Sequence, residues 1–74
     1  MNRLYSNIRK RRQELGMTQT ELAERIGYKD HTTVNKIEAG LVDISVGKLY
    51  QFAKALDISA FALLDWSPDE DEKK

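Results

Sequence analysis

Residues 19–40 read QTELAERIGYKDHTTVNKIEAG, and this stretch decides the fold. Apolar side chains recur at helical spacing over Gln19–Ile26. Thr18 and Glu21 form the pattern of a capping box, in which a hydroxyl and a carboxylate each bind an otherwise unpaired backbone amide. Gly27 ends the segment, because glycine readily adopts the left-handed conformation that closes a helix. The opening of the stretch therefore predicts a short helix followed by a tight turn.

The second half of the stretch predicts another short helix, His31–Ala39, with Asp30 as its N-cap and Gly40 as its stop. Only Val34 and Ile37 are apolar at inward spacing, so the remaining face of this helix is polar. A helix with so few apolar side chains exposes one side to a partner. The two segments have the arrangement of a helix-turn-helix, in which the first helix braces the second.

Three more helices are expected around this pair, over Arg3–Leu15, Val46–Leu56 and Ala60–Trp66. The apolar side chains expected to face the core in the helices outside His31–Ala39 are Leu4, Ile8, Leu15, Leu22, Ala23, Ile26, Val46, Leu49, Tyr50, Phe52, Ala53, Leu56, Phe61 and Leu64. Because no β-type alternation occurs, the predicted fold is all-α, a compact five-helix domain.

Length and composition exclude several classes of protein. A chain of 74 residues buries only a modest core, which argues against an enzyme with a deep pocket. With no cysteine and one histidine, we expect no disulfide, metal site or cofactor, and no small-molecule ligand. The longest apolar run, Ala60–Leu64, is far shorter than the roughly 20 residues of a membrane span, and no secretory signal opens the chain. We therefore expect a cytoplasmic protein that does not enter a membrane.

Charge is balanced overall but unevenly placed. Twelve Lys and Arg residues match twelve Asp and Glu residues. Residues 67–74 hold four of the acidic groups and two lysines, so the remaining chain carries ten basic and eight acidic groups. We predict a domain over residues 1–66 and an acidic, disordered tail over 67–74. The basic run Arg9–Arg12 is either a solvated face or part of a binding surface.

Residues 3–66 resemble the phage-repressor and Cro-like helix-turn-helix family, also called the XRE family. The landmarks are IRKRRQELGMTQTELAERIG, TTVNKIEAG and a later apolar helix that ends in KALDIS. The chain departs from the commonest pattern by one extra residue in the turn, at residues 28–30. The resemblance implies a lambda-repressor-like fold and a sequence-specific regulator of transcription, which acts as a repressor or occasionally as an activator. It further implies a homodimer on a near-palindromic operator in double-stranded DNA, and hence association with the nucleoid.

The resemblance also implies roles for the polar side chains of the second helix. His31, Thr32 and Lys36 take the positions that read bases, with Asn35 beside them. Lys36 can donate to guanine, Asn35 can pair with adenine, and Thr32 can contact a thymine methyl group. His31 donates or accepts according to its protonation, so its preferred base stays open.

Other residues are implied at the DNA backbone, and these are Gln19, Lys29, Thr33, Gly47 and Arg12. Gln19 opens the bracing helix, whose dipole favours an anion. Gly47 lies in a first helical turn, where it admits either a phosphate or the close packing of two helices. Arg12 lies on an apolar stripe and so requires an acidic partner, which the resemblance identifies as Glu38. Breaking this structural ion pair would cost about 3–5 kcal/mol.

Two apolar regions outside the motif have open roles. In the loop Leu41–Ile44, Asp43 would repel phosphate, so we expect little reading of the minor groove there. The apolar residues of that loop are either core lids or part of a dimer contact. Ala60, Leu63 and Trp66 either close the core or form a self-association surface, and we favour the dimer contact.

The charge distribution is also compatible with a function other than DNA binding. Zero net charge and the acidic tail suit an antitoxin or adaptor whose helices mainly bind a partner protein. Steep weakening of binding by salt would favour DNA, because phosphate contacts release counterions. An enzyme is not expected, because no nucleotide loop occurs and no nucleophile and carboxylate accompany His31 in the sequence.

Overall fold

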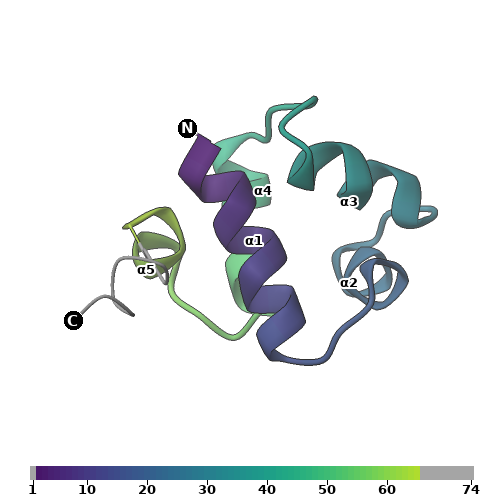
Figure 1. Ribbon diagram of the computed structural model, residues 1–74, viewed down its shortest axis with the longest axis horizontal. Coiled ribbons are helices and arrows are strands. Elements are labelled where there is room, and N and C mark those ends of the chain that lie inside the picture. Colours follow the sequence, from purple (N-terminus) through teal and green to yellow (C-terminus); the bar gives the residue numbers. More distant parts are fainter. Residues whose placement is uncertain (1, 66–74) are drawn as a thin grey trace.

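The computed structural model describes residues 2–65, which form five helices and no strand (Figure 1). The helices are α1 (Asn2–Glu14), α2 (Gln19–Ile26), α3 (His31–Glu38), α4 (Val46–Ala55) and α5 (Ala60–Asp65). The predicted all-α, five-helix fold is confirmed, and every predicted boundary within this range lies within one residue of the observed one. Trp66 and the predicted tail, 67–74, lie outside the described residues.

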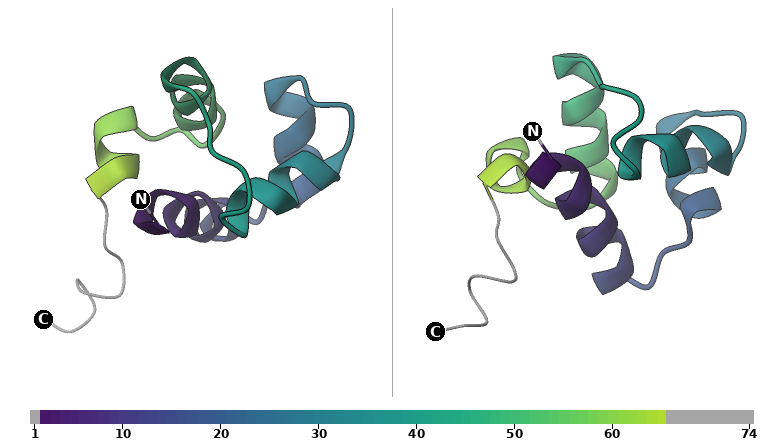
Figure 2. Two further views of the ribbon diagram at one scale, coloured as in Figure 1. Left: turned by 90° about the horizontal axis from the view of Figure 1, so that it is seen from above. Right: turned by 45° about the horizontal axis from the view of Figure 1, so that its top comes forward.

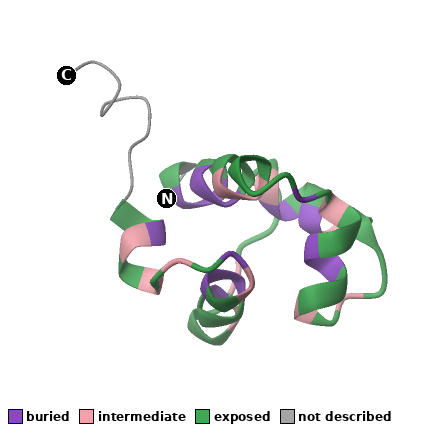
Figure 3. Cartoon of the chain, turned by 90° about the horizontal axis from the view of Figure 1, so that it is seen from below, coloured by how far each residue is buried: buried purple, intermediate pink, exposed green. Residues whose placement is uncertain are grey.

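The helices α2 and α3 pack together at one end of the domain, and α5 lies at the other (Figure 1, Figure 2). Between them, α1 packs on α3 and α5, while α4 packs on α2 and α5. The buried side of each helix turns toward this shared interior (Figure 3). The core consists of Leu4, Tyr5, Ile8, Met17, Leu22, Ala23, Val34, Ile37, Leu49, Phe52, Ala53, Leu56 and Leu63.

Side-chain caps start the helices where the sequence predicts. The Thr18 hydroxyl accepts a bond from the Glu21 backbone at 3.0 Å, and the Glu21 carboxylate accepts from the Thr18 backbone at 2.8 Å. The hydroxyls of Ser45 and Ser59 accept bonds from the backbone N–H groups of Lys48 and Ala62, and so cap α4 and α5. Gly27 has φ +97° and closes α2 with a bond from its N–H to the Ala23 carbonyl. The Gly27 bond thus begins the turn between α2 and α3, and the threonine and serine caps set where α2, α4 and α5 start.

Five side chains predicted to be buried are exposed, and these are Leu15, Val46, Tyr50, Phe61 and Leu64. On α5 the core side chain is Leu63, and Phe61 lies about 160° around the helix from it. Leu63 is fully buried, so our preference for it as a dimer contact is wrong. With only five helices, each one covers a narrow strip of core, and apolar residues beside that strip remain in solvent.

Polar side chains of α1 hold neighbouring elements in ways that the sequence did not reveal. The buried Asn7 donates to the Leu63 carbonyl at 2.7 Å. Arg11 donates to the Leu56 carbonyl at 2.9 Å, which places a cation at the C-terminal end of α4, where the helix dipole favours one. Thus α1 joins the parts of the domain through hydrogen bonds as well as apolar contacts.

Candidate nucleic-acid interface

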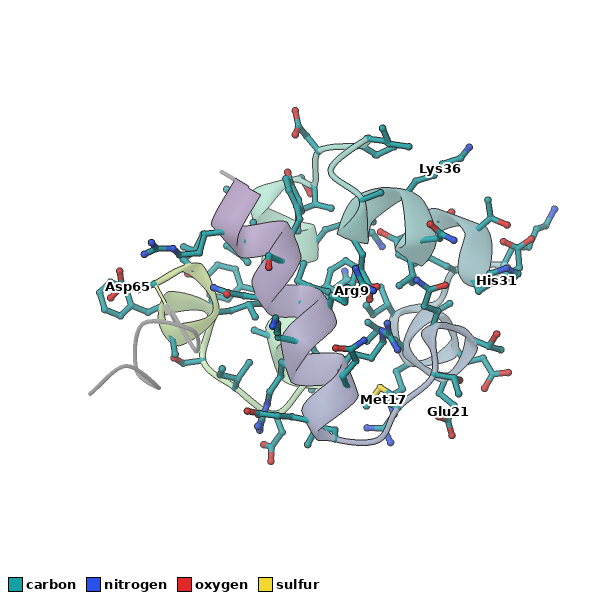
Figure 4. All side chains as sticks on the ribbon, in the orientation of Figure 1. Arg9, Met17, Glu21, His31, Lys36 and Asp65 are labelled. Atoms are coloured by element: carbon teal, nitrogen blue, oxygen red, sulfur yellow. The ribbon has the colours of Figure 1, made fainter. Side chains whose placement is uncertain are left out.

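The outer face of α3 is polar and exposed over the length of the helix. His31, Thr32, Asn35 and Lys36 are all exposed. Thr33 is half-buried. Figure 4 shows His31 and Lys36 pointing away from the other helices. The apolar side of α3 is fully enclosed, because Val34 and Ile37 have almost no contact with solvent. The helix is thus anchored on one side and presents hydrogen-bonding groups on the other.

Asp30 fixes the start of this exposed face. Its carboxylate accepts a bond from the Thr32 backbone N–H at 2.9 Å. That hydrogen bond from Thr32 is the main reason why the pKa of Asp30 lies below its usual value, with a smaller contribution from the nearby His31 and Lys36. The ionised cap sets the first turn of α3, and therefore the directions of His31 and Thr32.

Tyr28 anchors the turn between α2 and α3 to α4. Its ring is half-buried and lies 6.3 Å from the ring of Phe52, centroid to centroid. The Lys48 ammonium lies 4.7 Å from the centre of the Tyr28 ring, a cation–π contact between the turn and α4. Since Tyr28 points into the domain, the neighbouring Lys29 is left exposed in the turn before α3. The turn therefore presents an exposed cation two residues before α3 begins.

An ion pair joins the three helices that build this end of the domain. Arg12 of α1 donates from Nε to Glu38 Oε2 at 2.7 Å and from Nη2 to Glu38 Oε1 at 3.1 Å. Gln19, at the start of α2, donates to the same Glu38 Oε1 at 3.1 Å. The side chains of Arg12 and Glu38 are only 11% and 3% exposed. The structure thus places the expected pair together and adds Gln19 to it.

A polar pocket of about 260 Å³ opens beside this ion pair. Its lining residues come from α1, α2 and the end of α3, and they are Arg9, Arg12, Gln19, Asn35, Glu38 and Ala39. The expected site residues did not include Arg9, which reaches into the space between α1 and α3 (Figure 4). The signal that could have found it is its spacing of three residues from Arg12, which puts both on one side of α1.

Gly47 and the loop before α4 form another exposed edge. A Cβ atom added at Gly47 would meet only Ser45 Oγ within 4 Å, at 3.8 Å, so close packing of two helices does not explain this glycine. Leu41 is 75% exposed and Val42 is also exposed, so the two are not core lids. Asp43 accepts a bond from the buried Tyr5 hydroxyl at 2.9 Å, which ties the loop to α1.

No group of three His, Cys, Asp or Glu side chains within residues 2–65 is placed to hold a metal ion. None of the described helices has the length and apolar character needed to cross a membrane. His31 stands exposed at the start of α3.

Comparison with known proteins identifies the family. The helix-turn-helix family model matches residues 8–63. The chain belongs to the XRE family of helix-turn-helix proteins. It is therefore a DNA-binding regulator of transcription, in which α2 and α3 are the two helices of the motif. A comparison with curated proteins gives no significant match.

Solved structures of other proteins share this fold. A hypothetical transcription factor, NHTF, from Neisseria is 34% identical, with 95% of this chain and 78% of that chain covered and a TM-score of 0.79. The restriction-modification controller protein C.Esp1396I is 27% identical, with 99% and 94% covered and a TM-score of 0.79. A chain of the SinR protein/SinI protein complex is 31% identical, with 95% and 72% covered and a TM-score of 0.75.

Proposed function

We propose that the protein is a sequence-specific repressor of transcription that inserts α3 into the major groove of double-stranded DNA. The observation that carries this proposal is the two-sided character of α3, whose apolar residues are buried and whose polar face is free of the domain. An α-helix fits the major groove, where the four base pairs present different patterns of donors and acceptors. A rigid helix with an exposed polar face is suited to reading those patterns.

Four side chains of α3 are proposed to contact the bases. His31 and Thr32 lie in its first turn, which enters the groove most deeply in helix-turn-helix proteins. Asn35 and Lys36 lie one turn further along the same exposed face. The Asn35 amide suits adenine, the Lys36 ammonium suits guanine, and the Thr32 methyl suits thymine. His31 accepts or donates according to its protonation.

Contacts to the DNA backbone are proposed on the borders of this face. Gln19 and Arg12 lie on the side of α1 and α2, where the Glu38 carboxylate orients both. Lys29 lies in the turn before α3, and Thr33 is half-buried on α3 itself. The exposed Gly47 lets a phosphate approach the first turn of α4 closely. Such contacts position the protein but do not by themselves read sequence.

The active form is proposed to be a homodimer on a near-palindromic operator. One module of this size buries only about 600–1,000 Å² on DNA, so two copies raise the affinity substantially. A two-fold dimer places its two recognition helices about 34 Å apart, one turn of DNA. Exposed apolar side chains on α4 and α5 favour self-association, among them Val46 at 70% and Phe61 at 80% exposure. This repressor would work in the cytoplasm, on the nucleoid.

Selection of bound duplexes from a random pool tests this function directly. We expect one enriched sequence with two-fold symmetry and half-sites about one helical turn apart. Binding of that duplex should weaken steeply as salt rises, because phosphate contacts release counterions. If no sequence is enriched even at low salt, the proposal is wrong. The exposed apolar surface would then favour an adaptor or antitoxin role, and the SinR protein/SinI protein complex shows a neighbour of this fold bound to another protein.

A further inference from the structure

The three arginines in the basic run of α1 do different work, and the fold does not explain one of them, Arg9. Arg11 binds the carbonyl groups at the end of α4, and Arg12 is paired with Glu38. Arg9 is exposed, and no carboxylate within residues 2–65 pairs with it. It lines the polar pocket between α1, α2 and α3 (Figure 4). A guanidinium in the lining of a polar pocket is suited to binding an anion.

The charge balance of the pocket favours the same kind of ligand. Among residues 2–65, Glu38 is the only acidic residue in its lining, and its charge is compensated by Arg12. Both oxygens of Glu38 already accept hydrogen bonds, Oε2 from Arg12 and Oε1 from Arg12 and Gln19. The remaining polar residues, Gln19 and Asn35, are neutral donors. Arg9 therefore leaves the pocket with a net charge of about +1.

The position of the pocket indicates where such an anion would come from. Asn35 belongs both to its lining and to the exposed face of α3, so the pocket adjoins the proposed reading surface. The opposite wall belongs to α1, which does not form part of the helix-turn-helix motif. A helix that lies in the major groove is flanked on either side by the sugar–phosphate backbone. The anion that reaches this pocket would be a backbone phosphate rather than a base.

We propose that this pocket holds one phosphate of the bound DNA and that Arg9 is its principal cationic ligand. This inference rests on the proposed function and assigns one further DNA-binding residue to it. The backbone N–H of Gln19 lies in the first turn of α2, has no acceptor within its own helix, and can share the phosphate. A phosphate bound by a residue of α1 fixes how deeply α3 enters the major groove and at which base pairs, without itself reading the sequence.

Replacement of Arg9 by alanine tests this assignment, with Lys54→Ala as the matched control. Lys54 is an exposed cation of α4 outside the lining of this pocket, so both variants lose one positive charge. The probe is a duplex that the wild-type protein has selected from a random pool, titrated at a series of salt concentrations. For Arg9→Ala, the slope of log K against log salt should decrease in magnitude by about 0.9, the value of one phosphate contact. Affinity should fall about tenfold with unchanged base preference, and Lys54→Ala should match wild type.

A second measurement locates the contact on the DNA. Each phosphate of the selected duplex is replaced in turn by an uncharged methylphosphonate. At one position in each half-site, the replacement should weaken DNA binding by the wild-type protein but cause no further loss of binding by Arg9→Ala. Because Arg9 is exposed, the thermal unfolding midpoint of Arg9→Ala should equal that of the wild-type protein. This measurement separates a loss of binding from a loss of folding.

The possible failures of this test are distinguishable. An unchanged salt slope and affinity for Arg9→Ala, with wild-type binding intact, would overturn the assignment and leave the proposed function standing. A changed base preference would make Arg9 a base contact and would also overturn it. If the wild-type protein selects no duplex, the proposed function itself fails.

Discussion

Removal of the Glu38 carboxylate should strongly destabilise the folded domain. In Glu38→Ala, the Arg12 guanidinium would lose two of its three hydrogen bonds and keep only the one from Nη1 to the Met17 carbonyl, at 2.8 Å. Gln19 would lose its bond to Glu38 as well. The change would therefore leave a positive charge that is 11% exposed beside a cavity with no acidic group.

The size of the effect follows from this burial. Removing one partner of a buried pair costs about 3–5 kcal/mol, because the other charge stays desolvated. We expect about 3 kcal/mol, the lower end, since Arg12 keeps the Met17 bond and borders a pocket that water can enter. Domains of this length have roughly 5 kcal/mol of total stability, so the variant would keep only about 2 kcal/mol and would still be mostly folded without denaturant.

Urea unfolding followed by circular dichroism at 222 nm measures this loss. With a slope near 1 kcal/mol per molar urea, the midpoint should fall by about 3 M. Glu24→Ala is the control, because Glu24 is exposed on α2 and its removal should change stability by no more than about 0.5 kcal/mol. If Glu38→Ala proves too unstable to measure, Glu38→Gln gives a milder form of the same change. A loss of less than about 1 kcal/mol for Glu38→Ala would refute the reasoning that this charge pair is desolvated.

Three further predictions concern binding, pH and assembly. Lys36→Ala should alter the preferred bases and cost about 1–3 kcal/mol of binding free energy on the native site, whereas Gln19→Ala should weaken binding equally on all sequences. Selection experiments on both variants test these roles, which are wrong if Lys36→Ala keeps the preferred sequence or Gln19→Ala changes it. Burial, reinforced by its bond to Asp43, raises the pKa of Tyr5, so the Tyr5 hydroxyl of the unfolded chain loses its proton at a lower pH than that of the folded chain. The free energy of unfolding should therefore fall as pH rises above about 10. Tyr5→Phe should show a shallower decline with pH, and equal slopes for the two proteins would contradict this. Phe61→Ser should shift sedimentation toward the monomer without loss of helicity, and an unchanged distribution would exclude Phe61 from the dimer surface.

The local structure of the motif could be predicted because short-range rules decide it. The Thr18 capping box, the Asp30 cap and the left-handed Gly27 all depend on residues close together in the chain. Burial of Val34 and Ile37 followed from helical spacing alone. The exposed polar face of α3 could therefore be predicted as well, since it is what remains once the apolar side is assigned.

Side-chain environments that depend on packing could not be predicted in the same way. The apolar character of Phe61 and Tyr50 favours burial, yet which side of α5 or α4 meets the core depends on how other helices cross them. The bonds from Asn7 to the Leu63 carbonyl and from Arg11 to the Leu56 carbonyl join residues more than forty positions apart. The pocket beside Arg9 also needs three helices to be in place before it exists.

Burying the charges of Arg12 and Glu38 carries a large desolvation penalty for so small a core. Apolar side chains of similar volume often stabilise a protein as much as a buried charge pair does, or more, so stability alone does not explain it. The carboxylate of Glu38, however, holds donors from α1 and α2 in fixed directions at the edge of the pocket that adjoins α3. An apolar replacement would keep the packing but release both Arg12 and Gln19 from that orientation. The pair therefore suits the proposed function, because it holds the groups proposed to bind the DNA backbone in place before the duplex arrives.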